Sequence, residues 1–248
     1  MSLSVSAADG ALELPPVYDL VVLREAGDAF AHACAVAEEQ GAGTLVWVRR
    51  HDVAEFAVVL EPEEPLAGAR RAVYAGMNAL ADVLSAYAPP EQPISFAWPD
   101  TIQVDGVTVG GGRLGWPSGA AEDAVPHWLV FSGMIRTSVV HGEEPGLRPF
   151  SGGLDELGFE AVAAADIVEG FSRHLMAGFH DWSQAGFVSV EARWLARLAG
   201  DCVHARLADN GDLLISATSD RSPSERRSLV TALAAPSWLD PAAGMPWL

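Results

Sequence analysis

The stretch from Ile94 to Trp116 contains the strongest candidate in this chain for a surface that contacts a ligand. Three consecutive glycines, Gly110, Gly111 and Gly112, follow a short run in which apolar and polar residues alternate. Glycine leaves the backbone without side chains, so a ligand or another chain can approach it closely. The stretch therefore predicts a strand whose backbone is open to a close neighbour.

The sequence contains no lysine, and 15 arginines are present. The missing lysine excludes Schiff-base catalysis and a lysine-containing phosphate loop. Arg49 and Arg50 follow a predicted strand that begins after the turn at Gly43, and an arginine pair beside a glycine turn can hold a phosphate bidentately. Two solvated surface arginines explain the pair equally well. Arg113 and Arg136 are further candidate cations.

Three other kinds of site are not supported by the sequence. Residues 110–115 satisfy G-x-G-x-x-G, but a dinucleotide-binding loop must open a helix, and the following W-P-S-G cannot begin one cleanly. The seven histidines show no metal-binding spacing, since His174 and His180 on one predicted helix are too far apart for an i, i+4 pair. No G-x-S-x-G nucleophile elbow is present. The spacing therefore predicts no metal site.

The segment Trp98–Ile102, a short hairpin and the segment Thr108–Gly111 together resemble the core motif of the biotin and lipoate protein ligases. That motif reads W-P-N-D, an apolar residue, a hairpin and K-x-G-G, and the spacing here matches it residue for residue with partial identity. In the family, the Asn-Asp pair helps hold the adenylate and its metal-bound phosphate, and the lysine reaches the reacting carboxylate and phosphate. Those positions carry Asp100, Thr101 and Thr108 here, so the resemblance leaves the catalytic residue unknown.

The resemblance implies ATP with Mg²⁺ and biotin or lipoate as ligands, and a biotinyl or lipoyl carrier domain as a protein partner. Asp100 and Thr101 could together hold a ribose hydroxyl or a metal, and the alternative is an aspartate that caps its own turn. Trp98 is interpreted as core or as a wall of the pocket. The expected ligand- or nucleotide-binding residues are Gly43, Arg49, Arg50, Trp98, Pro99, Asp100, Thr101, Gly110, Gly111, Gly112, Arg113 and Arg136.

Arg113 is the candidate to replace the missing lysine. Side chains alternate along a strand, so Thr108, Gly110 and Gly112 are expected on one face and Arg113 on the other. A bulge within the glycines would change this assignment. The family's Arg- and Gly-rich phosphate loop corresponds loosely to Gly43 and the arginine pair, with a shorter connection.

Acyl transfer through cysteine, as in lipoyl and octanoyl transferases of the same fold, is a second enzymatic branch. Cys34 lies on a predicted helix with Phe30 and Ala37, which favours a buried structural thiol. Cys202 and His204 would share one face of a strand, so a Cys–His pair is conceivable there.

Composition narrows the classes of partner. The formal net charge is −18 and the pI about 4.6, so nucleic acid and anionic membranes are poor partners. Carrier domains of the ligase family are themselves generally acidic, so docking one would require a local basic patch. Two unpaired cysteines, no secretory signal and no apolar run of about 18 residues predict a cytoplasmic protein.

The predicted fold class is α+β, a mixed, mostly antiparallel sheet with helices packed on one face and a short C-terminal β appendage. The predicted organisation is a flexible arm at 1–16, the ligase-like domain at 17–200 and the appendage at 201–248. Helices are predicted at 25–40, 62–87, 156–182 and 188–198 from apolar residues at helical spacing. Strands are predicted at 18–23, 44–48, 56–60, 94–98, 101–104, 107–109, 127–131, 133–140, 203–207 and 213–216.

Three functions are consistent with these features. The first is a divergent family member that binds a biotin-, lipoate- or acyl-adenylate-type ligand without the standard ligation chemistry. The second is an active ligase or transferase that modifies a carrier-domain lysine and uses arginine in place of the motif lysine. The third is a non-catalytic scaffold of the same fold.

Overall fold

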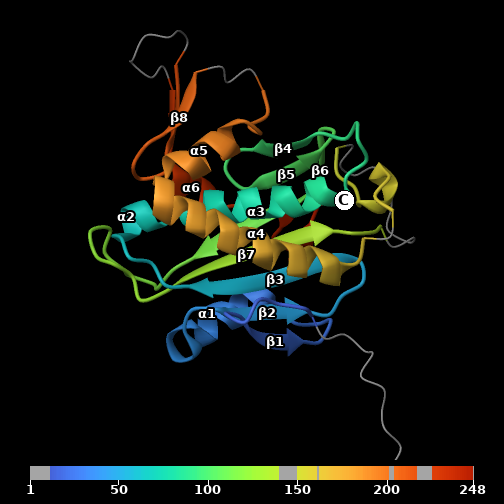
Figure 1. Ribbon diagram of the computed structural model, residues 1–248, viewed down its shortest axis with the longest axis horizontal. Helices are drawn as coiled ribbons and strands as arrows, with labels where there is room; N and C mark the ends of the chain where they lie inside the picture. The colour runs from blue at the N-terminus through green and yellow to red at the C-terminus, as the bar shows by residue number, and fades with distance from the viewer. Residues whose placement is uncertain (1–11, 140–149, 161, 201–203, 217–224, 248) are drawn as a thin grey trace, which may run out of the picture.

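A seven-stranded sheet forms the centre of the computed structural model, which describes residues 12–139, 150–160, 162–200, 204–216 and 225–247 (Figure 1). The strand order is β1-β2-β3-β7-β6-β5-β4, and only the β1–β2 pair is parallel. The strands are β1 Asp19–Leu23, β2 Thr44–Val48, β3 Val53–Leu60, β4 Ile94–Ala97, β5 Thr101–Val104, β6 Val107–Gly115 and β7 Leu129–Arg136. The predicted α+β class with a mixed, mostly antiparallel sheet is confirmed.

Helices cover both faces of this sheet rather than the one face that we predicted. The helices α3 (Ala72–Tyr87) and α4 (Ala164–Ala185) run side by side across one face, whereas α1 (Ala29–Gln40) packs on the other (Figure 1). All five residues of β2 are buried, so both faces of the central strands are apolar and both need a cover. We refer to the two sides as the α1 face and the α3–α4 face.

Two of the predicted long helices begin later than their apolar pattern suggested. The predicted helix at 62–87 is divided into α2 (Leu66–Ala69) and α3, and α2 starts directly after Pro65. A proline disfavours helical geometry in the residue before it, which keeps Glu64 out of the helix. The predicted helix at 156–182 begins at Ala164, because a short 3-10 helix, Asp155–Leu157, ends at Gly158 in a left-handed conformation.

The C-terminal region contains more structure than the two predicted strands. After α5 (Val188–Leu195), a small sheet comprises β8 (Ala205–Leu207), β9 (Leu213–Ile215) and β10 (Glu225–Arg227). The chain continues through α6 (Leu229–Leu233) into a separate two-stranded pair, β11 (Leu239–Asp240) and β12 (Met245–Pro246). β12 lies against β6 and β7, so the end of the described chain returns to the main sheet. None of the helices in the described residues is long and apolar enough to cross a membrane.

Candidate functional site

A bulge in β6 decides which side chains of the motif face the same way. Thr101 pairs with Gly111, but Gln103 pairs with Thr108, and the register shifts between Ile102 and Gln103. Residues directly opposite each other in a sheet point to the same face, and so do residues two apart on one strand. Thr108 and Gly111 therefore share the face of Thr101. The extra residue of the bulge lies between them.

Arg113 lies on that same face, because it follows Gly111 by two residues on a regular part of the strand. Its guanidinium stacks over the ring of Phe30 on α1, with 4.0 Å between Cζ and the ring centroid. The simple alternation that placed Arg113 opposite Thr108 does not hold, since the bulge intervenes. The candidate site is thus on the α1 face of the sheet.

A different neighbour excludes a side chain at each of the three glycines. A Cβ built on Gly110, whose φ is 150°, would collide with the backbone oxygen of Met134 on β7. A Cβ on Gly112 would meet the sulfur of Met77 in the core of the α3–α4 face. A Cβ on Gly111 would meet the backbone oxygen of Asp100 and the indole of Trp238. Of the three, Gly111 is the one that faces the candidate site, and a side chain from the C-terminal region lies against it.

Asp100 is the buried acid of the site. Its side chain is 1% exposed, Oδ1 lies 3.5 Å from the hydroxyl of Thr101, and Oδ2 has no hydrogen-bond partner among the described residues. Burial raises the pKa of Asp100 to about 7, and weaker interactions with its own backbone, Thr101 and Trp238 lower it in part. The carboxyl is therefore expected to titrate near neutral pH instead of in the usual acidic range. The preceding Pro99 is buried, and the Trp98–Pro99 peptide is cis.

Two of the predicted arginines approach the same face. Arg136 is 5% exposed and follows Met134 by two residues on β7, and its Nη2 donates to the carbonyl oxygen of Pro246 at 2.7 Å. Arg50 donates through Nε to the carbonyl oxygen of Glu25, and its Nη1 contacts the sulfur of Met245. Both guanidinium groups thus contact the β12 segment.

Arg50 also lies beside a buried acid that sequence reasoning did not single out. The Arg50 Nε is 3.5 Å from Oε2 of Glu55, and Oε1 of Glu55 accepts a hydrogen bond from the backbone amide of Ala29 at 2.9 Å. Burial raises the pKa of Glu55, while the Ala29 amide and the Arg50 charge act against that rise. Glu55 therefore binds the first turn of α1 to β3, at the helix end where the dipole favours a negative charge.

Three predicted site residues lie elsewhere. Arg49 is exposed over the ring of Trp47, at 6.0 Å from its centroid, and does not join Arg50. Gly43 precedes β2, whereas the arginine pair follows its far end. The indole of Trp98 donates to the hydroxyl of Tyr74 at 3.1 Å and packs into the core of the α3–α4 face. The sequence-predicted pair of arginines and the glycine turn thus do not form one phosphate loop.

Sequence reasoning missed the residues that complete the site, all from the C-terminal region. Trp238 is 1% exposed and forms a small cluster with Val53 and Met134 on the α1 face. The hydroxyl of Ser237 lies 3.2 Å from the hydroxyl of Thr101. Residues 236–247 have neither helical nor strand periodicity, and three prolines interrupt them. The one available signal was a tryptophan at each end of a short, proline-containing tail.

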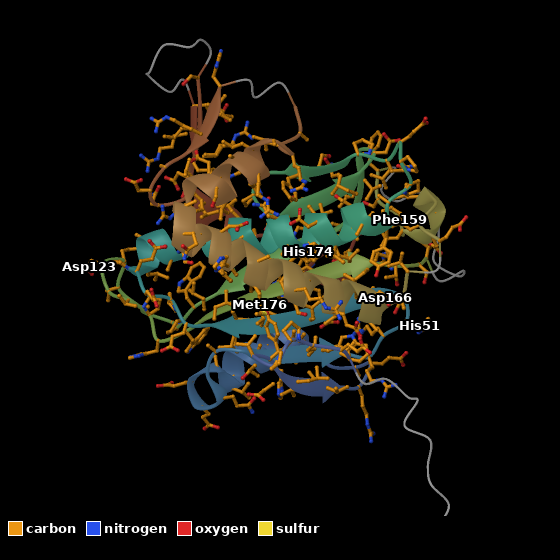
Figure 2. All side chains as sticks on the ribbon, viewed as in Figure 1. His51, Asp123, Phe159, Asp166, His174 and Met176 are labelled. Atoms are coloured by element: carbon orange, nitrogen blue, oxygen red, sulfur yellow. The ribbon has the colours of Figure 1, made fainter. Side chains whose placement is uncertain are left out.

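A separate hollow of about 810 Å³ opens on the α3–α4 face. It lies between α4 and the ends of β3 and β7, and Met176, labelled in Figure 2, lines it together with Leu60 and Phe179. Its lining is mainly apolar. Gly43 is the one predicted site residue that borders it.

The cysteine and metal alternatives gain no support from the described residues. Burial raises the pKa of Cys34 to about 11, although Arg113 lowers it slightly, so the thiol is not an activated nucleophile. Cys202, of the conceivable Cys202–His204 pair, lies outside the described residues. No group of three or more His, Cys, Asp or Glu that could hold a metal occurs in the part of the chain that is described.

The sequence of residues 14–196 matches the model of the biotin/lipoate A/B protein ligase family. The chain belongs to this family. The match covers the whole main sheet and the helices α1 to α5. A search of curated proteins found no match.

Solved structures support the same fold. A biotin protein ligase-like protein of unknown function from Silicibacter sp. TM1040 superposes with a TM-score of 0.77 at 24% identity, over 89% of this chain and 98% of that chain. A mutant biotin protein ligase from Aquifex aeolicus in complex with biotin gives 0.63 at 14% identity, over 86% and 100%. The biotin protein ligase of Leishmania major in complex with biotinyl-5-AMP gives 0.55 at 13% identity, over 81% and 95%. At these identities the likeness concerns the fold.

Proposed function

We propose that this family member binds a biotin-, lipoate- or acyl-adenylate-type small molecule on the α1 face without carrying out the standard ligation reaction. One arrangement carries the proposal: the guanidinium groups of Arg50 and Arg136 and the buried carboxyl of Asp100 lie on the α1 face of the sheet, where β6 has glycine at position 111. Guanidinium groups hold carboxylate and phosphate oxygens through charge-assisted hydrogen bonds. The relatives from Aquifex aeolicus and Leishmania major were solved with biotin and biotinyl-5-AMP, which belong to this ligand class.

The polar groups favour an adenylate over ATP with Mg²⁺. Mg²⁺ takes six oxygen ligands, usually including one or two protein carboxylates. Asp100 has a raised pKa, and a neutral carboxyl is a weak ligand for a cation. An acyl adenylate carries one phosphate, which two arginines can balance, whereas the triphosphate of ATP needs more positive charge. The described residues therefore fit the metal nucleotide poorly.

Ligation itself needs more than these residues supply. Joining a carboxylate to a nucleotide phosphate brings together two negatively charged groups, so cations must be aimed at the charge that develops between them. The position of the family lysine is held by Thr108, whose hydroxyl carries no charge. We therefore expect binding without turnover on ATP and a carrier domain.

An active ligase is the second candidate, and one observation favours it. The bulge places Arg113 on the face of Thr108, so a guanidinium is available on the correct side of the strand. An assay with ATP, biotin or lipoate and a biotinyl or lipoyl carrier domain decides between the two proposals. Modification of the carrier that is lost in Arg113→Gln would favour the active ligase.

Adjacent arginines provide a matched test of the binding proposal. Calorimetric titration with biotin, lipoate and biotinyl-5′-AMP is carried out on the wild-type chain and on the variants Arg50→Gln and Arg49→Gln. A hydrogen bond to a charged group contributes about 1.5–3 kcal/mol, so Arg50→Gln should weaken binding by roughly 10- to 100-fold. Arg49→Gln removes the same charge from the exposed neighbour and should change affinity less than twofold. Equal effects of the two substitutions would contradict the proposed site.

A further inference from the structure

We infer that the C-terminal segment 236–247, called here the C-terminal cover, occupies the ligand site of its own chain and must leave before a small molecule binds. This inference rests on the proposed function and adds a regulatory step to it. The cover comprises the β11–β12 pair and the residues around it. Its contacts with Arg50, Thr101 and Arg136 place it against three of the predicted site residues.

The indole of Trp238 takes the place of a ligand ring. It lies against Gly111, where even a Cβ atom would collide with its Nε1. It also packs against the apolar side chains of Val53 and Met134 on β3 and β7. A flat ring on a backbone that lacks a side chain is the arrangement that a glycine-containing strand can offer to a bound molecule. The cover fills this space from within the chain.

Polar groups of the cover engage the polar groups of the site one by one. The carbonyl oxygen of Pro246 accepts from Arg136 at 2.7 Å, as an oxygen of a carboxylate or phosphate would. Met245 contacts Arg50 through its sulfur, which is a weak acceptor for a guanidinium. Both arginines are thus in contact with the cover, and a ligand oxyanion would form charge-assisted bonds with the same guanidinium groups once the cover has left.

The cover brings the indole of Trp238 against the buried carboxyl of Asp100, and this contact lowers the pKa of the carboxyl. The contact falls short of standard hydrogen-bond geometry, so Oδ2 of Asp100 and Nε1 of Trp238 are buried without a well-formed hydrogen bond among the described residues. A poorly formed buried hydrogen bond destabilises the closed state, because both groups have lost their hydrogen bonds to water. A ligand that places an N–H or O–H donor near Asp100 and an oxyanion near the arginines would satisfy the site better. This defines the ligand class as an anion that also carries a donor group.

We expect that the cover can leave without breaking a strand ladder of the main sheet. β11 and β12 pair with each other, Leu239 with Pro246 and Asp240 with Met245, and they form no ladder with the seven-stranded sheet. Short elements with few backbone bonds to the rest of a protein open locally at a free energy below that of global unfolding. The apparent dissociation constant for a ligand is then the intrinsic constant divided by the fraction of open molecules.

A reversible lock tests the cover directly. The hydroxyls of Thr101 and Ser237 lie 3.2 Å apart, so the double variant Thr101→Cys, Ser237→Cys places two thiols within reach of a disulfide. Biotinyl-5′-AMP is titrated into the oxidised and the reduced forms, and mass spectrometry verifies the bond. We expect binding at least 100-fold weaker in the oxidised form, with recovery on reduction. Equal affinity of both forms would overturn the inference. Ser237→Cys alone controls for the oxidation step.

A substitution that opens the cover should strengthen ligand binding, whereas the disulfide lock should weaken it. Trp238→Ala should tighten the binding of biotinyl-5′-AMP at least tenfold, since it favours the open state. Trp128→Ala, which removes a partly buried tryptophan from the α1 cluster, is the matched control and should leave affinity within twofold. An unchanged affinity in Trp238→Ala would refute the inference.

The experiments distinguish an error in the inference about the cover from an error in the proposed function. If no form binds any of the probes, the proposed function is wrong, and hydrogen exchange on the wild-type chain tests the cover without a ligand. Local opening predicts that the amides of Gly244 and Trp247, both hydrogen-bonded within the cover, exchange much faster than those of β6 and β7. Exchange as slow as in β6 and β7 would identify the segment as permanent core and overturn the inference.

Discussion

The titration of Asp100 links the buried site to the stability of the whole chain. The pKa of this carboxyl is about 7, against 3.8 for the ordinary group, and burial is the main cause. Between these two values the folded chain holds a proton that the unfolded chain has released. The folded state therefore binds more protons, and the free energy of unfolding falls as pH rises through this window. Three pH units at 1.36 kcal/mol each correspond to about 4 kcal/mol.

The variant Asp100→Asn isolates this contribution, because it keeps the shape of the side chain and removes its charge. Urea denaturation of both proteins is measured at several values between pH 4 and pH 8. At pH 8 the asparagine variant should be more stable than the wild type by about 4 kcal/mol, and at pH 4 the difference should be small. The difference between variant and wild type is used because Glu55 also has a raised pKa and contributes to the pH dependence of both.

Asp105, an exposed acid at the turn of the same β5–β6 hairpin, provides the matched control. Asp105→Asn makes the same chemical change outside the buried site and should leave the pH dependence of stability unchanged. A stability difference between Asp100→Asn and wild type that stays constant from pH 4 to pH 8 would refute the reasoning. So would a loss of stability in Asp100→Asn that grows with pH.

Two further predictions concern packing and reactivity. Gly111→Ala should destabilise the chain by about 2 kcal/mol or more in urea denaturation, because the added methyl group meets the backbone of Asp100 and the indole of Trp238. Gly178→Ala, in α4 with open space around its Cβ, should instead stabilise it by about 0.5–1 kcal/mol, and a similar sign for both would contradict the contacts at Gly111. The thiol of Cys34 should react with iodoacetamide at pH 7 about 100-fold more slowly than an ordinary cysteine, given its pKa of about 11 against 9.0. A rate equal to that of a free thiol would show that the pKa of the partly buried Cys34 is not raised.

Local patterns in the sequence were sufficient for much of the fold. β2 lies at the predicted residues 44–48, and the β5–β6 hairpin turns at Asp105 as its Asp-Gly pair indicates. These elements depend on neighbours in the chain, so a single sequence contains their signals. The starts of α2 and α4 were missed because Pro65 and Gly158 act on one residue each, which an apolar periodicity averages out.

The placement of the candidate residues could be predicted in part. Asp100, Thr101 and Gly111 lie together on the α1 face, as do Arg50, Arg113 and Arg136. The bulge could not be placed, because a run of glycines has no side-chain alternation to fix the register. The contact between Arg50 and Met245 joins residues 195 apart in the chain. No local pattern encodes such a pair, so the position of the cover could not be predicted from the sequence.

The measurement that tests the central claim most directly is calorimetric titration of biotinyl-5′-AMP into the full chain carrying Trp238→Ala, in which the site is freed from its cover. The account predicts saturable binding of one ligand per chain, weakened at least tenfold when Arg50→Gln is added and unchanged when Arg49→Gln is added. Absence of binding in the folded Trp238→Ala chain, or equal losses from the two arginine substitutions, would contradict a ligand site on this face.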